Sequence, residues 1–231
     1  MTRSVELPAL FAHLPEIFLD GYCPDAPWAL LGEALDEVLE QLPSESIASP
    51  LHPEVHLAGD RIVIGKGSRI APGATLEGPL FIGSDVDIRA GAYLRGGVWI
   101  GDGCTVGANT EVKRSILLAK AKAPHLNYVG DSILGEGVNL GAGTVLSNFR
   151  QDGLEISIGG SGGIASGRRK LGAILGDGVK TGCNSVLHPG VVLGSGSEIY
   201  PLVQLRSGVY AAETIFKLRQ VIEEVEKRGL S

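Results

Sequence analysis

The fold of this chain is decided by residues 64–113, which read IGKGSRIAPGATLEGPLFIGSDVDIRAGAYLRGGVWIGDGCTVGANTEVK. Every sixth residue of this stretch is aliphatic, over nine successive positions: Ile64, Ile70, Leu76, Ile82, Ile88, Leu94, Ile100, Val106 and Val112. A period of six matches neither the 3.6 residues of a helical turn nor the simple alternation of a strand. It indicates a short strand followed by a sharp corner, repeated along the chain.

The same period returns twice further along the chain. The second run is Leu134, Leu140 and Leu146, and the third is Leu175, Thr181, Leu187, Leu193, Ile199 and Leu205. Three hexapeptides make a triangular coil of about 18 residues, and coils stack about 4.8 Å apart. The pattern predicts a mainly β chain folded as a left-handed parallel β-helix around one aliphatic column.

The period is interrupted at residues 113–133 and again at 147–172. Insertions into a solenoid form loops, often on its binding face. We therefore expect the chemistry of the protein at these two places. The second interruption is rich in glycine and serine and ends in the basic run Arg168, Arg169 and Lys170.

The flanks have helical spacing, which divides the chain into a helical N-terminal extension (1–50), a β-helix domain (51–208) and a C-terminal helix (209–231). Residues 5–19 are expected to form a short helix. A second helix is expected from Asp25 as N-cap, with Pro27 in its first turn, to Pro43. The C-terminal helix has an apolar stripe that would pack on the solenoid or on a second copy: Ile215, Leu218, Ile222 and Val225.

Composition excludes several classes of protein. The chain has 231 residues with 20 basic and 26 acidic side chains, and a net charge of −6 argues against nucleic acid as its main ligand. Its three cysteines lie far apart without CxxC spacing, so we expect neither a zinc site nor disulfides, and a reducing cytoplasm. No signal peptide or membrane-spanning stretch is indicated, so no membrane partner is expected.

A row of charged residues follows from the 18-residue coil. Glu77, Arg95 and Lys113 are spaced by 18, so they should stack on one corner of successive coils. Like charges in register are unfavourable unless something offsets them. Arg95 above Lys113 therefore suggests an anion site, most naturally for a phosphate. The structural alternative is that Glu77 pairs with Arg95 while Lys113 is simply solvated.

Three polar residues near the first interruption are further candidates. His125 lies in what the period predicts to be an irregular segment, and histidine suits general-base catalysis at neutral pH. Asn139 and Asn148 flank one hexapeptide run and offer donors and acceptors to sugar hydroxyls and amines. For each asparagine, a role in a corner or turn is an equally good interpretation.

Residues 111–150, EVKRSILLAKAKAPHLNYVGDSILGEGVNLGAGTVLSNFR, resemble a known enzyme domain. It is the acetyltransferase domain of the bacterial bifunctional N-acetylglucosamine-1-phosphate uridyltransferase/glucosamine-1-phosphate acetyltransferase. Archaeal sugar-1-phosphate nucleotidylyltransferases that carry amino-sugar-1-phosphate acetyltransferase activity in a C-terminal β-helix look closer still. They too have a segment like GRRKLGAILGD (167–177), and the resemblance covers roughly residues 60–206.

The resemblance implies roles for individual residues. His125 matches the general base, and the sugar phosphate would be bound by Arg95, Lys113, Tyr128, Asn139 and Asn148. Cys183 falls where the bacterial family often has a serine near the acetyl group. The family also has a lysine where this chain has Leu154. The Arg168–Lys170 run would supply that charge, bind the phosphates of CoA, or form only a solvated turn.

The function implied is transfer of acetyl from acetyl-CoA to the amine of a hexosamine 1-phosphate, with no metal required. Relatives are homotrimers whose sites lie between subunits. The nucleotidylyltransferase half is missing before the repeat, so a separate nucleotidylyltransferase is a candidate partner. Two alternatives stay open: a non-catalytic or partner-dependent subunit of such an enzyme, and an acyltransferase for a nucleotide-linked amino sugar.

Overall fold

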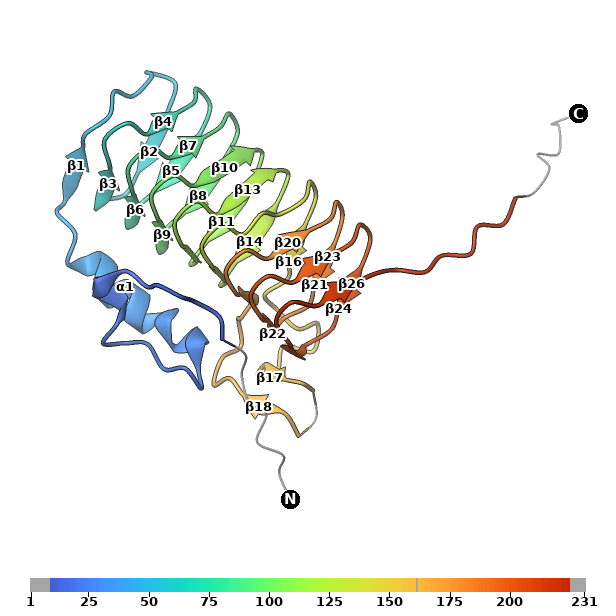
Figure 1. Ribbon diagram of the computed structural model, residues 1–231. Coiled ribbons are helices and arrows are strands. Elements are labelled where there is room, and N and C mark those ends of the chain that lie inside the picture. Colours follow the sequence, from blue (N-terminus) through green and yellow to red (C-terminus); the bar gives the residue numbers. More distant parts are fainter. Residues whose placement is uncertain (1–8, 161, 225–231) are drawn as a thin grey trace, which may run out of the picture.

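The computed structural model describes residues 9–160 and 162–224, which form a stack of triangular coils with a helical segment along one side (Figure 1). Neighbouring coils pair in parallel along three faces. Ile64 lies opposite Ile82, and Val112 lies opposite Leu94, so the predicted 18-residue repeat holds in this region. The predicted left-handed parallel β-helix is thereby confirmed.

Two faces are continuous sheets. The nine-stranded sheet contains β1 (Glu45–Ile47), β3 (Ile62–Ile64), β6 (Leu80–Ile82), β9 (Val98–Ile100), β12 (Ile116–Leu117), β15 (Ile133–Leu134), β19 (Ala173–Leu175), β22 (Val191–Leu193) and β25 (Gly208–Tyr210). The eight-stranded sheet contains β2 (His56–Ala58), β5 (Thr75–Glu77), β8 (Tyr93–Arg95), β11 (Glu111–Lys113), β14 (Tyr128–Gly130), β16 (Val145–Leu146), β21 (Val186–Leu187) and β24 (Gln204–Leu205).

The third face is divided into two sheets. One contains β4 (Arg69–Ile70), β7 (Asp87–Ile88), β10 (Thr105–Ala108) and β13 (Lys122–His125), and the other contains β20 (Lys180–Thr181), β23 (Glu198–Ile199) and β26 (Ile215–Phe216). Asn139 bridges the two sheets, pairing with Lys122 on one side and Lys180 on the other. A complete coil, such as β9, β10 and β11, supplies one short strand to each face.

The solenoid core is the predicted aliphatic column. Every aliphatic residue of the three six-residue runs belongs to one buried cluster, and the single polar member, Thr181, is buried beside it. The Thr181 hydroxyl is 2.8 Å from that of Thr144, so its polar group is satisfied within the column.

The first interruption is not an insertion, contrary to the prediction. Lys113 still lies 18 positions after its partner Arg95, but Ile116 lies only 17 after its partner Trp99. One residue is lost at the corner that follows Lys113, and a second at the corner that follows Gly130, since Ile133 again lies only 17 after its partner Ile116. Arg114 and Asp131 adopt left-handed conformations at these corners, each with a φ of 46°. The coils continue from there without a loop, and residues 113–133 are regular solenoid.

The second interruption is a real insertion, as predicted. Ile133 pairs directly with Ile174, so the intervening chain leaves the coil and returns to it. Part of this insertion forms a hairpin of β17 (Ser157–Ile158) and β18 (Ile164–Ala165). Figure 1 shows the hairpin beside the N-terminal segment, at the edge of the solenoid.

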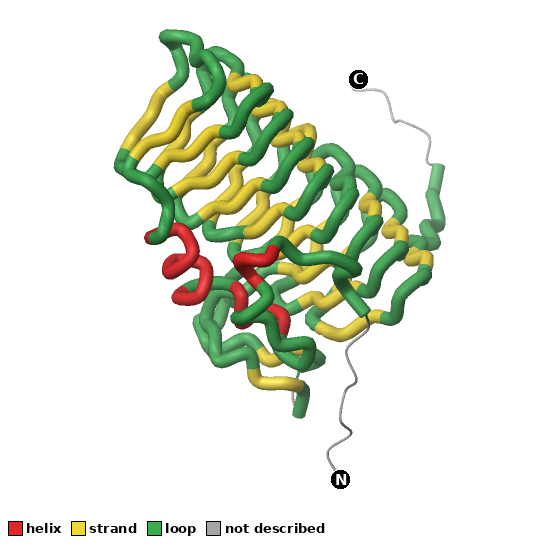
Figure 2. Tube along the Cα trace, turned by 60° about the vertical axis from the view of Figure 1, so that its left-hand side comes forward, coloured by secondary structure: helices red, strands yellow, loops and turns green. Residues whose placement is uncertain are grey.

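The N-terminal extension covers the outer side of the nine-stranded sheet (Figure 2). Its helices are η1 (Glu16–Phe18), η2 (Pro27–Leu30) and α1 (Glu33–Glu40). The continuous helix expected from Asp25 to Pro43 is therefore wrong, because Leu31 is extended and Gly32 has a φ of 69°. The expected helix at 5–19 is reduced to η1 among the residues described, and residues 5–8 lie outside them.

Two domain boundaries also differ from the prediction. Strand β1 already pairs with β3, so the solenoid begins before residue 51. The C-terminal helix predicted at 209–231 is absent over residues 209–224, which form part of β25, then β26 and an extended tail. Tyr210 and Phe216 pack edge to face at 5.2 Å at the last coil, so tertiary pairing overrides the helical spacing. Val225 and the residues after it lie outside the described part.

Candidate functional site

Arg95 and Lys113 are neighbours on the outer face of the eight-stranded sheet. Strand pairing places Lys113 opposite Arg95 and Gly130 opposite Lys113, while Glu77 precedes Arg95 by one coil. The predicted stacking of the two cations is confirmed. The row continues through Gly130, which has no side chain.

Arg95 pairs with Glu111, at 2.7 Å between guanidinium and carboxylate. This contact raises the pKa of Arg95. Glu77 instead accepts a 2.6 Å hydrogen bond from the Tyr93 hydroxyl, so the predicted alternative pairing of Glu77 with Arg95 is wrong. Sequence reasoning missed Glu111, although it lies two residues before Lys113 and so on the same strand face.

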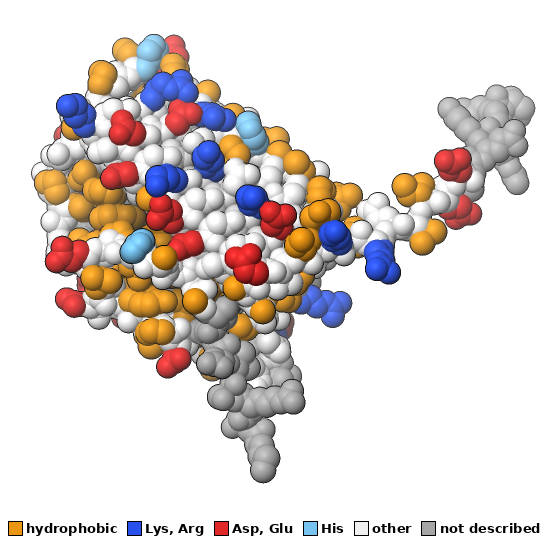
Figure 3. Space-filling view, viewed as in Figure 1, with side chains coloured by type: hydrophobic (Ala, Val, Ile, Leu, Met, Phe, Trp, Pro, Cys, Tyr) orange, Lys and Arg blue, Asp and Glu red, His pale blue; other side chains and the backbone are white. Residues whose placement is uncertain are grey.

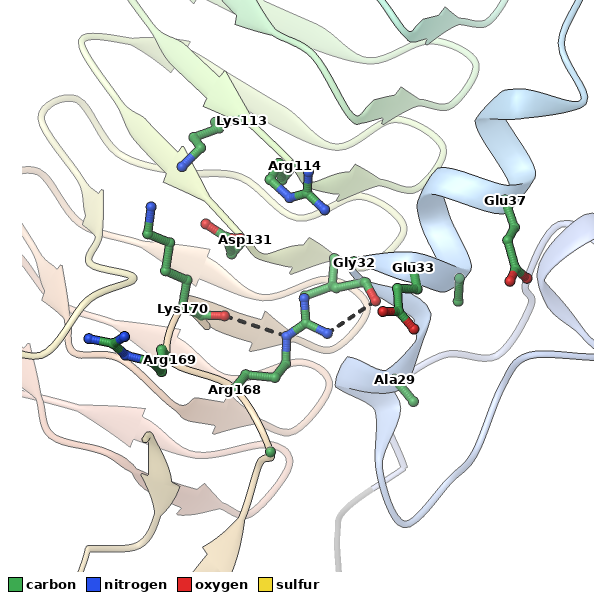
Figure 4. Close-up of a pocket in the computed structure, with 13 residues that line it drawn as sticks. Ala29, Gly32, Glu33, Glu37, Lys113, Arg114, Asp131, Arg168, Arg169 and Lys170 are labelled. Atoms are coloured by element: carbon green, nitrogen blue, oxygen red, sulfur yellow. Dashed lines mark hydrogen bonds between the residues drawn. The ribbon is translucent and has the colours of Figure 1, made fainter. Parts of the chain in front are cut away.

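Lys170 extends from the insertion toward Lys113. Figure 4 shows both ammonium groups directed into one space beside Asp131. Burial, together with the nearby Lys170 charge, lowers the pKa of Lys113, and Asp131 opposes the shift. A backbone hydrogen bond of 3.0 Å from Leu171 to the Asn148 carbonyl fixes the end of the insertion here. Two ammonium groups and Arg95 carry more positive charge than the nearby Asp131 carboxylate offsets, so the geometry suits a further anion such as a phosphate.

Tyr128 and Asn148 meet above Gly130. A Cβ on Gly130 would lie 2.6 Å from the Asn148 amide nitrogen and 2.7 Å from the Tyr128 hydroxyl. Asn148 is buried, and its amide donates a 2.6 Å hydrogen bond to Asp131. The structure thus brings Arg95, Lys113, Tyr128 and Asn148 to one place. Asp131, which lies within the PHLNYVGDS motif, was missed by sequence reasoning.

His125 lies at the opposite corner of the same coil, exposed at the end of β13. The predicted irregular segment is wrong, since this residue continues a regular strand. The Asn127 side chain accepts a 3.1 Å hydrogen bond from the backbone N–H of His125. Gly107 lies beneath, where any side chain would overlap the Pro124 carbonyl. Residues 127–130 cross the face between the two corners, a distance of about 10 Å at 3.3 Å per residue.

Asn139 and Cys183 lie on the third face of the solenoid, on the His125 side. Asn139 pairs with Lys122 and is therefore separated from Asn148, which lies at the far corner. Hydrogen bonds from Gly143 to the His125 carbonyl and from Asn184 to the Ala142 carbonyl place Cys183 two coils from His125. That spacing is about 10 Å, and the Cys183 thiol is exposed.

The three residues of the basic run, Arg168, Arg169 and Lys170, make different contacts. Arg168 donates to the Leu31 carbonyl at 3.1 Å, and Arg169 donates to the Gly153 carbonyl at 2.9 Å. Only Lys170 of the three reaches the space beside Lys113 (Figure 4). Leu154, which stands where the family has a lysine, is 62% exposed.

A pocket of about 800 Å³ opens beside these residues, between the solenoid and the N-terminal extension. Its solenoid and insertion side is mainly basic, while Glu33 and Glu37 of α1 form an acidic wall opposite (Figure 4). Figure 3 shows that basic and acidic side chains are also interspersed over the solenoid face seen there. Among the described residues, no group of three or more His, Cys, Asp or Glu side chains could hold a metal ion, and no helix has the length and apolarity to span a bilayer.

Comparison with known families identifies the family of this chain. The model of the GMPPB C-terminal domain matches residues 76–195. The chain belongs to this family. The matched range contains the row of Arg95 and Lys113, the His125 corner and Cys183. The GMPPB C-terminal domain of this chain therefore includes every candidate residue named above.

Two relatives extend the comparison. A bifunctional sugar-1-phosphate nucleotidylyltransferase/acetyltransferase of Sulfurisphaera tokodaii is 48% identical over 97 residues, covering 42% of this chain and 24% of the relative. A bifunctional protein GlmU of Methanococcus aeolicus is 31% identical over 218 residues, covering 94% of this chain and 52% of the relative. The chain thus spans about half the length of the second relative and about a quarter of the first.

Among solved structures, a hexapeptide transferase family protein from Anaplasma phagocytophilum is 20% identical, with a TM-score of 0.28. The match covers 74% of this chain and 87% of that chain.

Proposed function

We propose that this member of the GMPPB C-terminal domain family is an acetyltransferase that acetylates the amine of a hexosamine 1-phosphate with acetyl-CoA. One observation carries the proposal: Lys113 and Lys170 face each other beside Arg95, and Tyr128 and Asn148 lie over the neighbouring Gly130. This arrangement suits a phosphate dianion attached to a polar ring. The acetyltransferases among the named relatives support the reaction type.

The substrate would lie across the eight-stranded sheet. Its phosphate would bind between Lys113 and Lys170, and its amine would point toward the His125 corner. Tyr128 and Asn148 would contact the ring between them.

His125 would act as the general base. As the neutral amine attacks the thioester carbonyl, the new C–N bond forms and the imidazole takes the amine proton. Collapse of the tetrahedral intermediate breaks the C–S bond, and the proton passes to the departing CoA thiolate. Proton transfer of this kind typically contributes about 10²–10⁴-fold to the rate. Cys183 would lie near the acetyl group without forming an acyl-enzyme, since two coils separate it from His125.

We also infer that the working unit is a homotrimer. Leu126, which follows His125, is 61% exposed and has a left-handed φ of 52°, and Leu202 is exposed on the same corner three coils further on. Apolar side chains in such a position favour cover by another subunit. The catalytic corner would then be enclosed between protomers, as the resemblance implies. Asn139 would reach the substrate from this side.

The test is release of free CoA thiol from acetyl-CoA by the purified chain. Glucosamine 1-phosphate, galactosamine 1-phosphate and UDP-glucosamine would be offered in parallel. Release with one of the 1-phosphates supports the proposal and identifies the sugar epimer. Release with UDP-glucosamine alone would favour a nucleotide-sugar acyltransferase, and silence of a folded oligomer would favour a subunit dependent on a separate nucleotidylyltransferase.

Arg95→Ala tests the phosphate row within the same assay. We expect a raised KM for the sugar phosphate and little change in the KM for acetyl-CoA. Arg89→Ala is the matched control, because it removes a similar exposed ion pair, with Asp87, on another face. Equal effects of Arg95→Ala on both substrates would contradict the assignment.

A further inference from the structure

The N-terminal extension reaches the edge of the candidate site. Its apolar side chains pack on the nine-stranded sheet, with Phe18 edge to face against Trp99 at 5.1 Å. Trp99 in turn stacks on Phe81, with ring centroids 3.8 Å apart. This packing places the turn before α1 against the end of the insertion. The extension thus forms one wall of the pocket.

Two arginines connect the extension to the pocket. Arg114, at the corner after Lys113, pairs with Asp36 of α1 at 2.8 Å. Arg168 donates to the Leu31 carbonyl at 3.1 Å and is about half buried, which lowers its pKa. This bond holds the guanidinium against the extension and uses one of its five N–H donors. Arg168 therefore ties the insertion to the extension.

Gly32 is adapted to this arginine. A Cβ at Gly32 would lie 2.6 Å and 2.9 Å from the two terminal nitrogens of the Arg168 guanidinium. The residue also has a φ of 69°, which glycine adopts without strain. The same turn that ends the expected long helix thus makes room for Arg168. Extension and insertion fit each other at this point.

Arg168 also contacts the backbone that carries Lys170. Its Nε donates to the Lys170 carbonyl at 3.4 Å, and Figure 4 shows the guanidinium between that carbonyl and the turn at Gly32. Lys170 faces Lys113, and two like charges repel each other. An insertion end left free would relieve that repulsion by moving away. The Leu171–Asn148 hydrogen bond and the bridge between Phe149 and Lys170 hold this backbone on the solenoid side, and Arg168 holds it on the side of the extension.

We propose that Arg168 is a positioning residue through which the N-terminal extension holds Lys170 opposite Lys113, so that the extension is part of the phosphate site. The inference rests on the proposed function for the identity of the ligand. It assigns to residues 31–32 a role in substrate affinity. It also separates the basic run into an anchor, Arg168, and a ligand-binding side chain, Lys170.

The experiment compares Arg168→Met with Arg61→Met. Arg61 donates to the Leu42 carbonyl at 2.9 Å, so it fastens the other end of the extension in the same manner, away from the pocket. Binding of inorganic phosphate is measured by calorimetry, and KM values for the sugar phosphate and acetyl-CoA are measured where turnover is found. Melting temperatures of all variants are recorded.

We expect Arg168→Met to weaken phosphate binding and to raise the KM for the sugar phosphate by about tenfold. This is the effect of losing one charge-assisted contact, the one that Lys170 makes with the phosphate. In Arg168→Met, the KM for acetyl-CoA should stay within about twofold of the wild-type value. Arg61→Met should change neither phosphate affinity nor the KM for the sugar phosphate, even if it lowers the melting temperature as much as Arg168→Met does. In a Lys170→Met background, Arg168→Met should add little, because its effect acts through Lys170.

Equal affinities in Arg168→Met and Arg61→Met would overturn the inference. A rise in the acetyl-CoA KM alone would also overturn it, since Arg168 would then contact the cofactor. Full additivity with Lys170→Met would show that the two residues act independently. If the wild-type chain acetylates none of the amino sugars but Arg168→Met still weakens phosphate binding, the proposed function fails and the positioning role stands.

Discussion

Replacing Gly130 by alanine tests the geometry of the site most directly. The added Cβ would lie 2.6 Å from the Asn148 amide nitrogen, 2.7 Å from the Tyr128 hydroxyl and 2.9 Å from the Tyr128 ring. Ordinary contact begins at 3.4 Å, so the nearest atom must move by about 0.8 Å. Asn148 cannot move freely, because its amide is bonded to Asp131 in a buried position.

The expected magnitude follows from this displacement. Misplacement of a substrate-positioning group by about 1 Å costs up to about 10²-fold in rate, so we expect kcat/KM to fall by about 10–100-fold. Overpacking of this kind costs about 1–3 kcal/mol, or about 3–10 °C in melting temperature for a chain of this size. Thiol release from acetyl-CoA and thermal unfolding measure the two effects.

Gly208→Ala is the control for this experiment. Its Cβ would meet the Tyr210 ring at 3.5 Å, which is an ordinary contact, on a coil far from the site. We expect near-wild-type kinetics and stability for this variant. If Gly130→Ala also kept the wild-type kcat, KM and melting temperature, the packing of Tyr128 and Asn148 over Gly130 would be refuted as a feature of the working site.

Three further predictions concern single groups. His125→Ala should abolish turnover but leave folding and phosphate binding almost intact, because its side chain is exposed; near-wild-type turnover would exclude it as the base. Because the pKa of Lys113 is lowered, this side chain should lose its charge at a lower pH than an ordinary lysine, and phosphate affinity should fall at that pH. Calorimetric titration with phosphate over a pH series should show the fall in affinity. Lys113→Arg should abolish this pH dependence, because arginine stays charged. Iodoacetamide should label exposed Cys23 and Cys183 in the native protein but not Cys104, whose pKa burial raises to about 12; acetyl-CoA should protect Cys183 alone, as mass spectrometry of peptides would show.

The interpretation of residues 113–133 shows a limit of counting along a sequence. A break in a six-residue period is the same signal whether residues are added or removed. Here one residue is lost at the corner after Lys113 and another at the corner after Gly130, which the backbone accommodates by left-handed conformations at Arg114 and Asp131. His125 therefore lies on a regular strand, and its setting was predicted wrongly although the residue itself was singled out.

The sequence by itself determined the solenoid and the stacking of Arg95 on Lys113. Each coil of a solenoid contacts only its neighbours, so register follows from local spacing and needs no knowledge of the rest of the chain. The aliphatic column could be predicted for the same reason, because its period is repeated in every coil.

Only the tertiary structure decided which segments outside the coils join the site. Lys170 reaches Lys113 because the insertion returns along the corner beside the N-terminal extension, and Gly32 interrupts the expected helix where Arg168 packs. Similarly, residues 209–216 form strands on the last coil rather than the helix that their spacing suggested. These outcomes depend on contacts between residues far apart in the chain, where burial and pairing outweigh local propensity.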